Sequence, residues 1–344
     1  MSETRRIGKY EVRDLVGKGA GSAVYRGADG SKMVALKLMN RATVPAQALA
    51  RLQQNAATFA RVRHPAIATF IEAIEADSVL CIVSELAEGE SLASRMKDGA
   101  PYDLRATWEI ARQLLEGIES AHMRGVFHGN LKLTNLIVDR ESRLKVTDLA
   151  AFGLGELTPN AYIAPEQLGG GAPDARSDLY QVGAIVYHLV AGRAPFSGAR
   201  DEIAHRVRQE RPTDPSSYSP KIAWQLDWVI QRALSKEPMD RFGSAREFLD
   251  GLRLGLQDSI GSPLPVPAPP PAVEVKSAPA RDAAKAAPQA KAAEPAKSAA
   301  PVAHAKPGAP TAPPKAAAPA APPKTAAPAA PATPPKAAAP VIPA

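Results

Sequence analysis

The eight residues at positions 128–135 read His-Gly-Asn-Leu-Lys-Leu-Thr-Asn, HGNLKLTN. They follow residues 105–125, in which apolar side chains recur at three- and four-residue spacing, a pattern that predicts a helix. The eight side chains include an imidazole, an ammonium group and two carboxamides. What this segment can do depends on the elements that surround it.

The residues before residue 90 are rich in predicted strands. Residues 10–38 hold three apolar runs separated by glycine-containing turns, which predicts a three-stranded antiparallel meander. Residues 45–62, rich in alanine, glutamine and leucine, predict a helix, and residues 66–86 predict two further strands joined by a short turn. The sequence therefore predicts a five-stranded sheet with one helix.

The residues after the segment are mainly helical in pattern. Residues 177–192 are apolar on most faces, as in a helix buried at the centre of a domain, and residues 222–238 and 244–256 predict two more helices. The fold class is therefore α+β, with a small lobe at about 10–87 and a larger helical lobe at about 88–256. The cleft between two such lobes is a natural ligand site.

The composition changes abruptly at about Gln257. Residues 257–344 hold 23 of the 34 prolines and no aromatic residue, so we expect this tail to be disordered and to act as a semi-rigid spacer. It carries nine Lys or Arg and four Asp or Glu, a net +5 of the formal +7. An alternative is weak, salt-sensitive binding of a polyanion such as nucleic acid by the tail, since the remaining +2 predicts no nucleic-acid surface elsewhere.

Other bulk properties narrow the class of protein. The single cysteine, Cys81, excludes an internal disulfide, fits a reducing compartment and has the apolar neighbours of a buried strand residue. Residues 1–9 lack the apolar core of a signal peptide and are expected to be a short N-terminal extension. No apolar stretch is long enough to span a bilayer, so we expect a cytoplasmic protein.

Four short motifs occur in one order: GKGAGSAVY at 17–25, VALK at 34–37, HGNLKLTN at 128–135 and APE at 164–166. Together they resemble the bacterial type of serine/threonine protein kinase, over about three quarters of the chain, residues 10–256. The resemblance implies a two-lobed protein-kinase fold, ATP and Mg²⁺ in the cleft, and a protein as substrate or partner.

The resemblance assigns the nucleotide-binding positions. Gly17 and Gly19 belong to a glycine-rich hairpin whose backbone N–H groups approach the phosphates, with Ser22 in place of the third glycine. Lys37 corresponds to the lysine that pairs with the α- and β-phosphates. The other expected contacts are Val24, Ala35 and Ile137 around the adenine, and Glu85 and Ala87 in the hinge.

The resemblance also assigns the catalytic and metal-binding positions. Lys132 matches the catalytic loop of the family, and Asn135 and Asp148 correspond to its two oxygen ligands of Mg²⁺. Asn130 stands where the family has a catalytic aspartate, and a carboxamide is not a useful base at neutral pH. Losing a positioned general base costs about 10²–10⁴-fold in rate.

Further positions depart from the family pattern. Gly129 replaces the arginine that receives the activation-loop phosphate, and the loop itself is short, with Thr158 as its one notable hydroxyl. Asn55 stands where the family has the glutamate that holds the lysine equivalent to Lys37. No acidic residue occurs between Lys37 and Glu72, so no shift of alignment can supply that glutamate.

Positions that support the fold of the large lobe are retained. Asp178 and Gly183 match the helix that anchors the catalytic loop, and Glu166 and Arg241 match a buried ion pair of the family. Three hypotheses follow. The first is a pseudokinase that binds ATP and acts through protein contacts; the second is a divergent active serine/threonine kinase; the third is a scaffold that binds no nucleotide.

Overall fold

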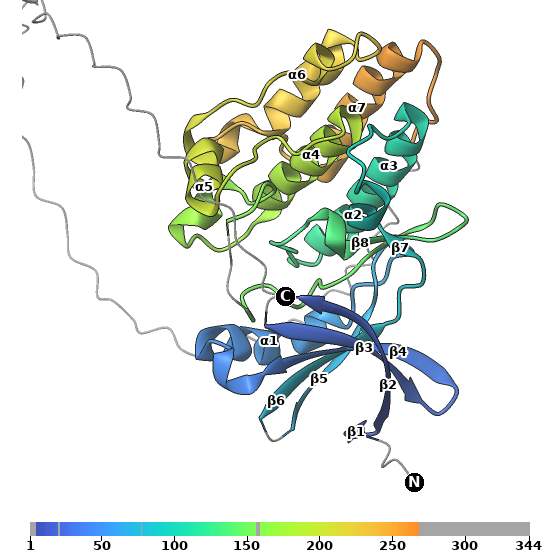
Figure 1. Ribbon diagram of the computed structural model, residues 1–344, viewed down its shortest axis with the longest axis vertical. Helices are drawn as coiled ribbons and strands as arrows, with labels where there is room; N and C mark the ends of the chain where they lie inside the picture. The colour runs from blue at the N-terminus through green and yellow to red at the C-terminus, as the bar shows by residue number, and fades with distance from the viewer. Residues whose placement is uncertain (1–4, 20, 77, 156–158, 268–344) are drawn as a thin grey trace, which may run out of the picture. The chain divides into compact units, whose positions relative to one another are not determined.

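The computed structural model folds the first part of the chain into an antiparallel sheet with strand order β1-β2-β3-β4-β6-β5 (Figure 1). The strands are β1 Arg6–Ile7, β2 Tyr10–Gly19, β3 Ser22–Asp29, β4 Lys32–Asn40, β5 Phe70–Ala76 and β6 Val79–Glu85. The prediction of five strands was wrong by one, because Ile7 of the expected extension pairs with Tyr10 and is buried. A two-residue strand is too short to show an alternating pattern.

The structure describes residues 5–19, 21–76, 78–155 and 159–267. Thr158 and residues 268–344, which make up most of the predicted disordered tail, lie outside the described residues. Residues 257–267 belong to the folded lobe, which corrects the predicted boundary at 256. Helix α7 (Ala245–Ile260) continues past that boundary, and Leu264 is only 6% exposed. Composition misplaced the boundary because these residues lead directly into the proline-rich sequence.

Helix α1 (Ala46–Phe59) matches the helix predicted at 45–62. Its buried residues Leu52 and Phe59 pack in the same apolar cluster as Phe70 of the sheet. A second cluster, which includes Leu36 and Cys81, fills the other side of the sheet. Cys81 is fully buried, as predicted, and burial raises the pKa of its thiol to about 12.

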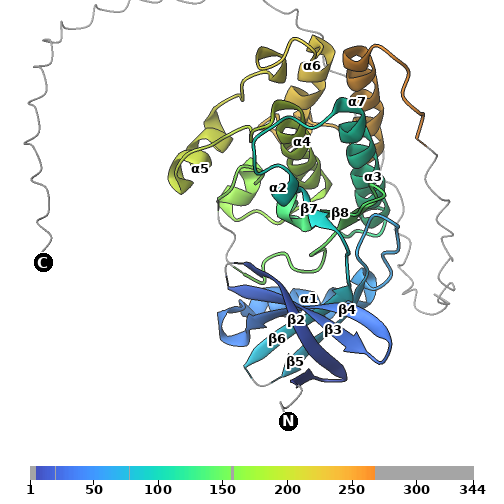
Figure 2. The same ribbon diagram turned by 45° about the vertical axis from the view of Figure 1, so that its right-hand side comes forward.

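The second part of the chain forms the helical lobe (Figure 2). Its α-helices are α2 Leu92–Arg95, α3 Leu104–His122, α4 Ala175–Ala191, α5 Arg200–Gln209, α6 Trp224–Ala233 and α7. Strands β7 Glu90–Ser91, β8 Leu136–Val138 and β9 Leu144–Val146 form a small antiparallel sheet. The 3₁₀-helices are η1 Arg41–Thr43 in the small lobe, then η2 Leu133–Asn135, η3 Pro165–Gly169, η4 Pro215–Ser217 and η5 Pro238–Asp240.

Helix α4 lies at the centre of the large lobe and is buried along most of its length, which confirms the prediction from its apolar faces. Its N-terminus is capped by Asp174, whose carboxylate accepts a hydrogen bond from the Ser177 N–H. In the described ranges, none of the helices has both the length and the apolar content needed to cross a membrane.

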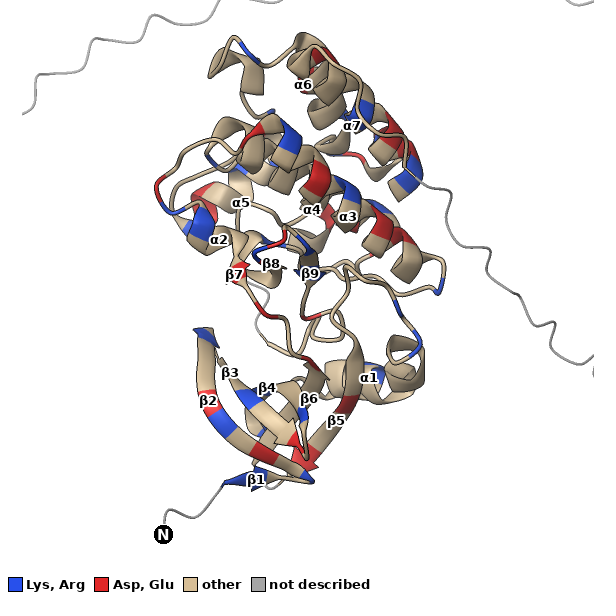
Figure 3. Cartoon of the chain, turned by 90° about the vertical axis from the view of Figure 1, so that its right-hand side faces the viewer, with Lys and Arg blue, Asp and Glu red and all other residues tan. Residues whose placement is uncertain are grey.

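The two lobes are joined by main-chain hydrogen bonds as well as by the chain itself. The N–H of Ala68, before β5, donates to the carbonyl of Val146 in β9, and the N–H of Val146 donates to the carbonyl of Ala66. One apolar cluster also runs from α1 into the large lobe. Charged residues of both signs alternate along α3 and α7 (Figure 3), consistent with the small net charge expected for the folded part.

Candidate active site

Strand pairing places three predicted nucleotide-binding residues on one face of the sheet. Val24 of β3 lies opposite Lys37 of β4, and Ala35 lies two residues from Lys37 in the same strand. Val34 and Leu36, on either side of Ala35, point into the buried cluster instead. Gly17 lies opposite Val24, so the glycine-rich hairpin adjoins this face. A Cβ atom on Gly17 would meet nothing within 4 Å.

The ammonium group of Lys37 is paired with a carboxylate from the large lobe. Its Nζ lies 2.6 Å from Oδ2 of Asp148, and the two side chains are 19% and 22% exposed. Asn55, at the position of the family's glutamate, donates from its side chain to the carbonyl of Arg51 in its own helix. The pair with Asp148 could not be predicted from the sequence, because it depends on the relative position of the lobes.

The segment 128–135 is held by hydrogen bonds to buried groups. The Asp178 carboxylate accepts from the N–H groups of His128 (2.8 Å) and Gly129 (2.7 Å), and it contacts Nε2 of His122 at 2.8 Å. Gln181 of α4 accepts from the Leu131 N–H at 2.6 Å. The anchoring role of Asp178, expected from the resemblance, has this geometric basis.

Two glutamines near this segment were missed from the sequence. Side-chain amides of Gln167 and Gln181 both donate to the carbonyl of Gly129, at 2.7 Å and 2.9 Å, and Gln181 also donates to Gln167. Both side chains are almost fully buried. Gln167 directly follows the APE motif, which gives no sign of this contact. Gln181 lies within residues 177–192, predicted to be a buried helix, and a polar residue there was the one available indication.

The predicted catalytic residues converge at this loop. The Asn135 side-chain amide donates to the carbonyl of Asn130 at 3.0 Å, and the carbonyl of Asn135 accepts from the Thr147 N–H, next to Asp148. Burial lowers the pKa of the Lys132 ammonium, the nearby charge of Lys37 lowers it further, and Asp148 opposes this. Within the described residues, no carboxylate forms an ion pair with Lys132.

Asp148 has a left-handed backbone conformation with φ 68°, and Ser142 is the one other non-glycine residue with positive φ in the described ranges. The strained turn directs its carboxylate to Lys37. In the described part of the chain, no three His, Cys, Asp or Glu residues converge on a metal position. Asn135 and Asp148 alone fit Mg²⁺ only where phosphate and water oxygens complete the coordination, which is usual for this ion.

The hinge is braced on its outer side by Glu85. Its carboxylate accepts from Lys145 of β9 at 2.6 Å and from the Thr69 N–H at 3.2 Å. Burial would raise the pKa of Glu85, but these hydrogen bonds outweigh burial and hold it below the ordinary value. Because this carboxylate is engaged, a contact of Glu85 with adenine would involve its backbone. Ala87 and Ile137 are half-buried.

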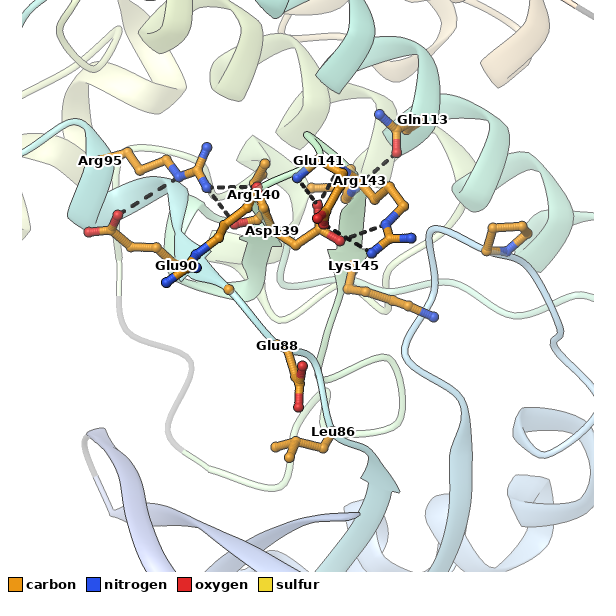
Figure 4. A pocket seen from close by; sticks show the side chains of 14 residues that line it. Leu86, Glu88, Glu90, Arg95, Gln113, Asp139, Arg140, Glu141, Arg143 and Lys145 are labelled. Carbon is orange, nitrogen blue, oxygen red and sulfur yellow. Dashed lines mark hydrogen bonds and ion pairs between the residues drawn. The ribbon is translucent and has the colours of Figure 1, made fainter. Parts of the chain in front are cut away.

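A large cavity, with a volume of about 1130 Å³, lies between the hinge and the β8–β9 turn (Figure 4). Its walls include Leu86, Glu88 and Lys145, and much of its charge is paired, as Arg143 is with Asp139 and Glu141. None of the predicted phosphate- or metal-binding residues lines it. This cavity is therefore separate from the candidate active site.

The predicted ion pair of the large lobe is present. Arg241 donates to both carboxylate oxygens of Glu166 at 2.8 Å, and its side chain is fully buried. Ser177 also donates to Glu166 at 2.7 Å, and the carbonyls of Ser235, Arg176 and Lys236 accept from Arg241. Every charged group is thus hydrogen-bonded, the condition under which a buried pair is tolerated.

Comparisons with known proteins agree with this geometry. The model of the protein kinase domain family matches residues 10–251. A probable serine/threonine-protein kinase of Streptomyces coelicolor is 30% identical over 76% of this chain and 43% of its own. The serine/threonine-protein kinase PksC of Streptomyces coelicolor is 31% identical (76% and 51%), and Pkn1 of Myxococcus xanthus is 29% identical (74% and 39%). The chain thus spans about half or less of these relatives, and over most of its own length it belongs to the protein kinase family.

Proposed function

We propose that the chain is a pseudokinase: it binds ATP in the cleft between the lobes, transfers phosphate poorly or not at all, and acts through contacts with a protein partner. The observation that carries this proposal is Asn130. It occupies the position of the general base in a loop that hydrogen bonds to the buried residues Asp178 and Gln181 hold in place. The scaffold around the reaction centre is kept while the group that accepts the proton is not.

The charges in the cleft favour a bound phosphate. Lys37 lies close enough to Lys132 for its charge to lower the pKa of Lys132, and Asp148 supplies one carboxylate against the two ammonium groups. A phosphate chain would compensate the excess positive charge. The glycine-rich hairpin, with open space at Gly17, leaves room for backbone N–H groups to approach it.

Mg²⁺, when bound with ATP, would supply positive charge between the phosphates. Asn135 and Asp148 are the residues that would hold it, and Lys37 would exchange its ion pair with Asp148 for a phosphate oxygen. Asn130 can donate or accept a hydrogen bond and so orient a hydroxyl, but it does not take up a proton at neutral pH.

A divergent active kinase is the second candidate. The three relatives are named as serine/threonine-protein kinases, which favours it, as do the retained residues Lys37, Lys132 and Asp148. The two candidates share ATP binding and differ in phosphotransfer. A scaffold that binds no nucleotide is the third candidate. It differs from the other two because it does not bind ATP.

Calorimetric titration of the full chain with ATP and Mg²⁺ tests the shared property. Lys132→Met should weaken binding about tenfold, since it removes an unpaired cation facing the phosphates. Lys32→Met, the same change at an exposed position at the outer end of β4, should bind as the wild type does. Absence of binding by the wild-type chain at millimolar ATP would leave the scaffold hypothesis.

A further inference from the structure

The ring of Phe152 packs beside Gly129 in the catalytic loop, where a side chain is missing. Gly129 is buried, with φ 69°, and a Cβ atom placed on it would lie 2.7 Å from Cδ2 of Phe152 and 2.7 Å from Cγ of Pro173. No side chain fits there without displacing these rings, and a residue with a Cβ would also be strained at this φ. The space beside position 129 is therefore filled by Phe152 and Pro173.

The other side of Phe152 faces helix α1. The guanidinium carbon of Arg51 lies 5.1 Å from the centroid of the Phe152 ring, within the range of a cation–π contact. The Arg51 side chain is half-buried, and this burial lowers the pKa of its guanidinium. Desolvation strengthens such a contact.

The surrounding packing is tight. Leu52 and Phe59 of α1, together with Leu149, Ala150 and Phe152, enclose a space of only about 10 Å³. Leu149 and Ala150 are both buried in the apolar cluster that joins the lobes. Movement of α1 away from the large lobe would therefore open this packing.

We propose that Phe152 is a positioning residue: its ring, seated beside Gly129 and covered by Arg51, ties α1 to the catalytic loop without an ion pair and without a phosphate group. Asn55 cannot anchor α1 through Lys37, and position 129 has no cation to receive a phosphate. Apolar packing and one cation–π contact instead hold α1 and the catalytic loop in place. The proposal concerns the same cleft as the proposed function, but its main test needs no nucleotide.

Amide hydrogen exchange of the full, nucleotide-free chain provides that test. Phe152→Ala should speed exchange of α1 at least about tenfold relative to α4, because it removes the contact that opening of α1 must break. Phe152→Leu, which keeps apolar bulk but loses the ring face, should give a smaller change. The matched control is Phe196→Ala, the same truncation in the cluster with Ile163 and Val207. It should leave the ratio of α1 to α4 exchange as in the wild type.

Substitution of Arg51 separates positioning from general stability. Arg51→Met keeps the length of the side chain and should speed α1 exchange, whereas Arg51→Lys keeps a cation over the ring and should restore part of the protection. Phosphatase treatment of the purified chain should leave the exchange pattern unchanged.

The proposal is overturned if Phe152→Ala changes exchange equally throughout the domain, if Arg51→Lys behaves as Arg51→Met does, or if phosphatase treatment releases α1. Failure of ATP to bind would contradict the proposed function and leave these exchange results intact, so the two failures are distinguishable.

Discussion

Lys37 of the small lobe and Asp148 of the large lobe form an ion pair across the cleft, with 2.6 Å between Nζ and Oδ2. Both side chains are about four-fifths buried, so the pair is less screened by solvent than a surface pair. It places a candidate phosphate-binding lysine on a candidate metal-binding carboxylate. The same contact therefore links the two lobes. It also balances the charge of Lys37 while no phosphate is bound.

Replacing Asp148 by asparagine should weaken this link. We expect Asp148→Asn to lower the free energy of unfolding by about 1–3 kcal/mol, between the values of exposed and fully buried pairs. Urea denaturation measures this change. Asp29→Asn, which breaks an exposed pair with Lys9, is the control and should change stability by less than about 1 kcal/mol. Equal effects of the two substitutions would mean that the cleft pair is not formed in solution.

Placing a carboxylate at position 130 should increase phosphate transfer. Asn130→Asp should raise the rate of phosphate transfer to a generic protein substrate by about 10²–10⁴-fold, the usual contribution of a positioned base. A single-turnover assay with labelled ATP measures the transfer. Robust transfer by the wild-type chain, with only a modest gain in the variant, would favour the divergent kinase instead.

The ion pair between Glu85 of the hinge and Lys145 should contribute less to stability at low pH. Because the pKa of Glu85 is lowered in the folded protein, its pair with Lys145 contributes stability above the ordinary glutamate value of 4.5 and loses it as the pH falls through the lower folded value. The difference in unfolding free energy between wild type and Glu85→Gln should therefore shrink below about pH 4.5. A difference that stays constant from pH 7 to the acid limit of folding would argue against the brace.

The ion pair of the large lobe should matter far more than a surface pair. Glu166→Gln leaves the buried Arg241 without its counter-charge and should cost about 3–5 kcal/mol. Glu141→Gln at the exposed pair with Arg143 should stay within about 1 kcal/mol. Thermal and urea unfolding measure both. A small effect of Glu166→Gln would show that Arg241 is solvated in solution.

Much of the architecture could be predicted, because local patterns of apolar residues determine it. The alternation in residues 10–38 gives the meander, and the apolar faces of 177–192 give the central helix. Strand β1 could not be predicted, because a strand of two residues is too short to show an alternating pattern. The end of the folded lobe was misplaced, because the buried Leu264 lies between two prolines.

The candidate site divides in the same way. The resemblance assigned roles to Lys37, Lys132, Asn135 and Asp148 from the sequence, whereas the contact of Lys37 with Asp148 depends on how the lobes meet. In the sequence, Gly129 stands where the family has an arginine, and only that loss is visible. In the folded chain its missing Cβ makes room for Phe152, a relation between distant positions that no local pattern contains.

The measurement that most directly tests the central claim, that the cleft between the lobes binds ATP, is thermal unfolding of the full chain with and without ATP and Mg²⁺. Ligand at a hundred times its dissociation constant adds about 2.7 kcal/mol, which corresponds to a rise in Tm on the order of 5–10 °C for a domain of this size. The account predicts such a rise with ATP, diminished in Lys132→Met and unchanged in Lys32→Met. No rise at millimolar ATP, with or without Mg²⁺, would contradict it.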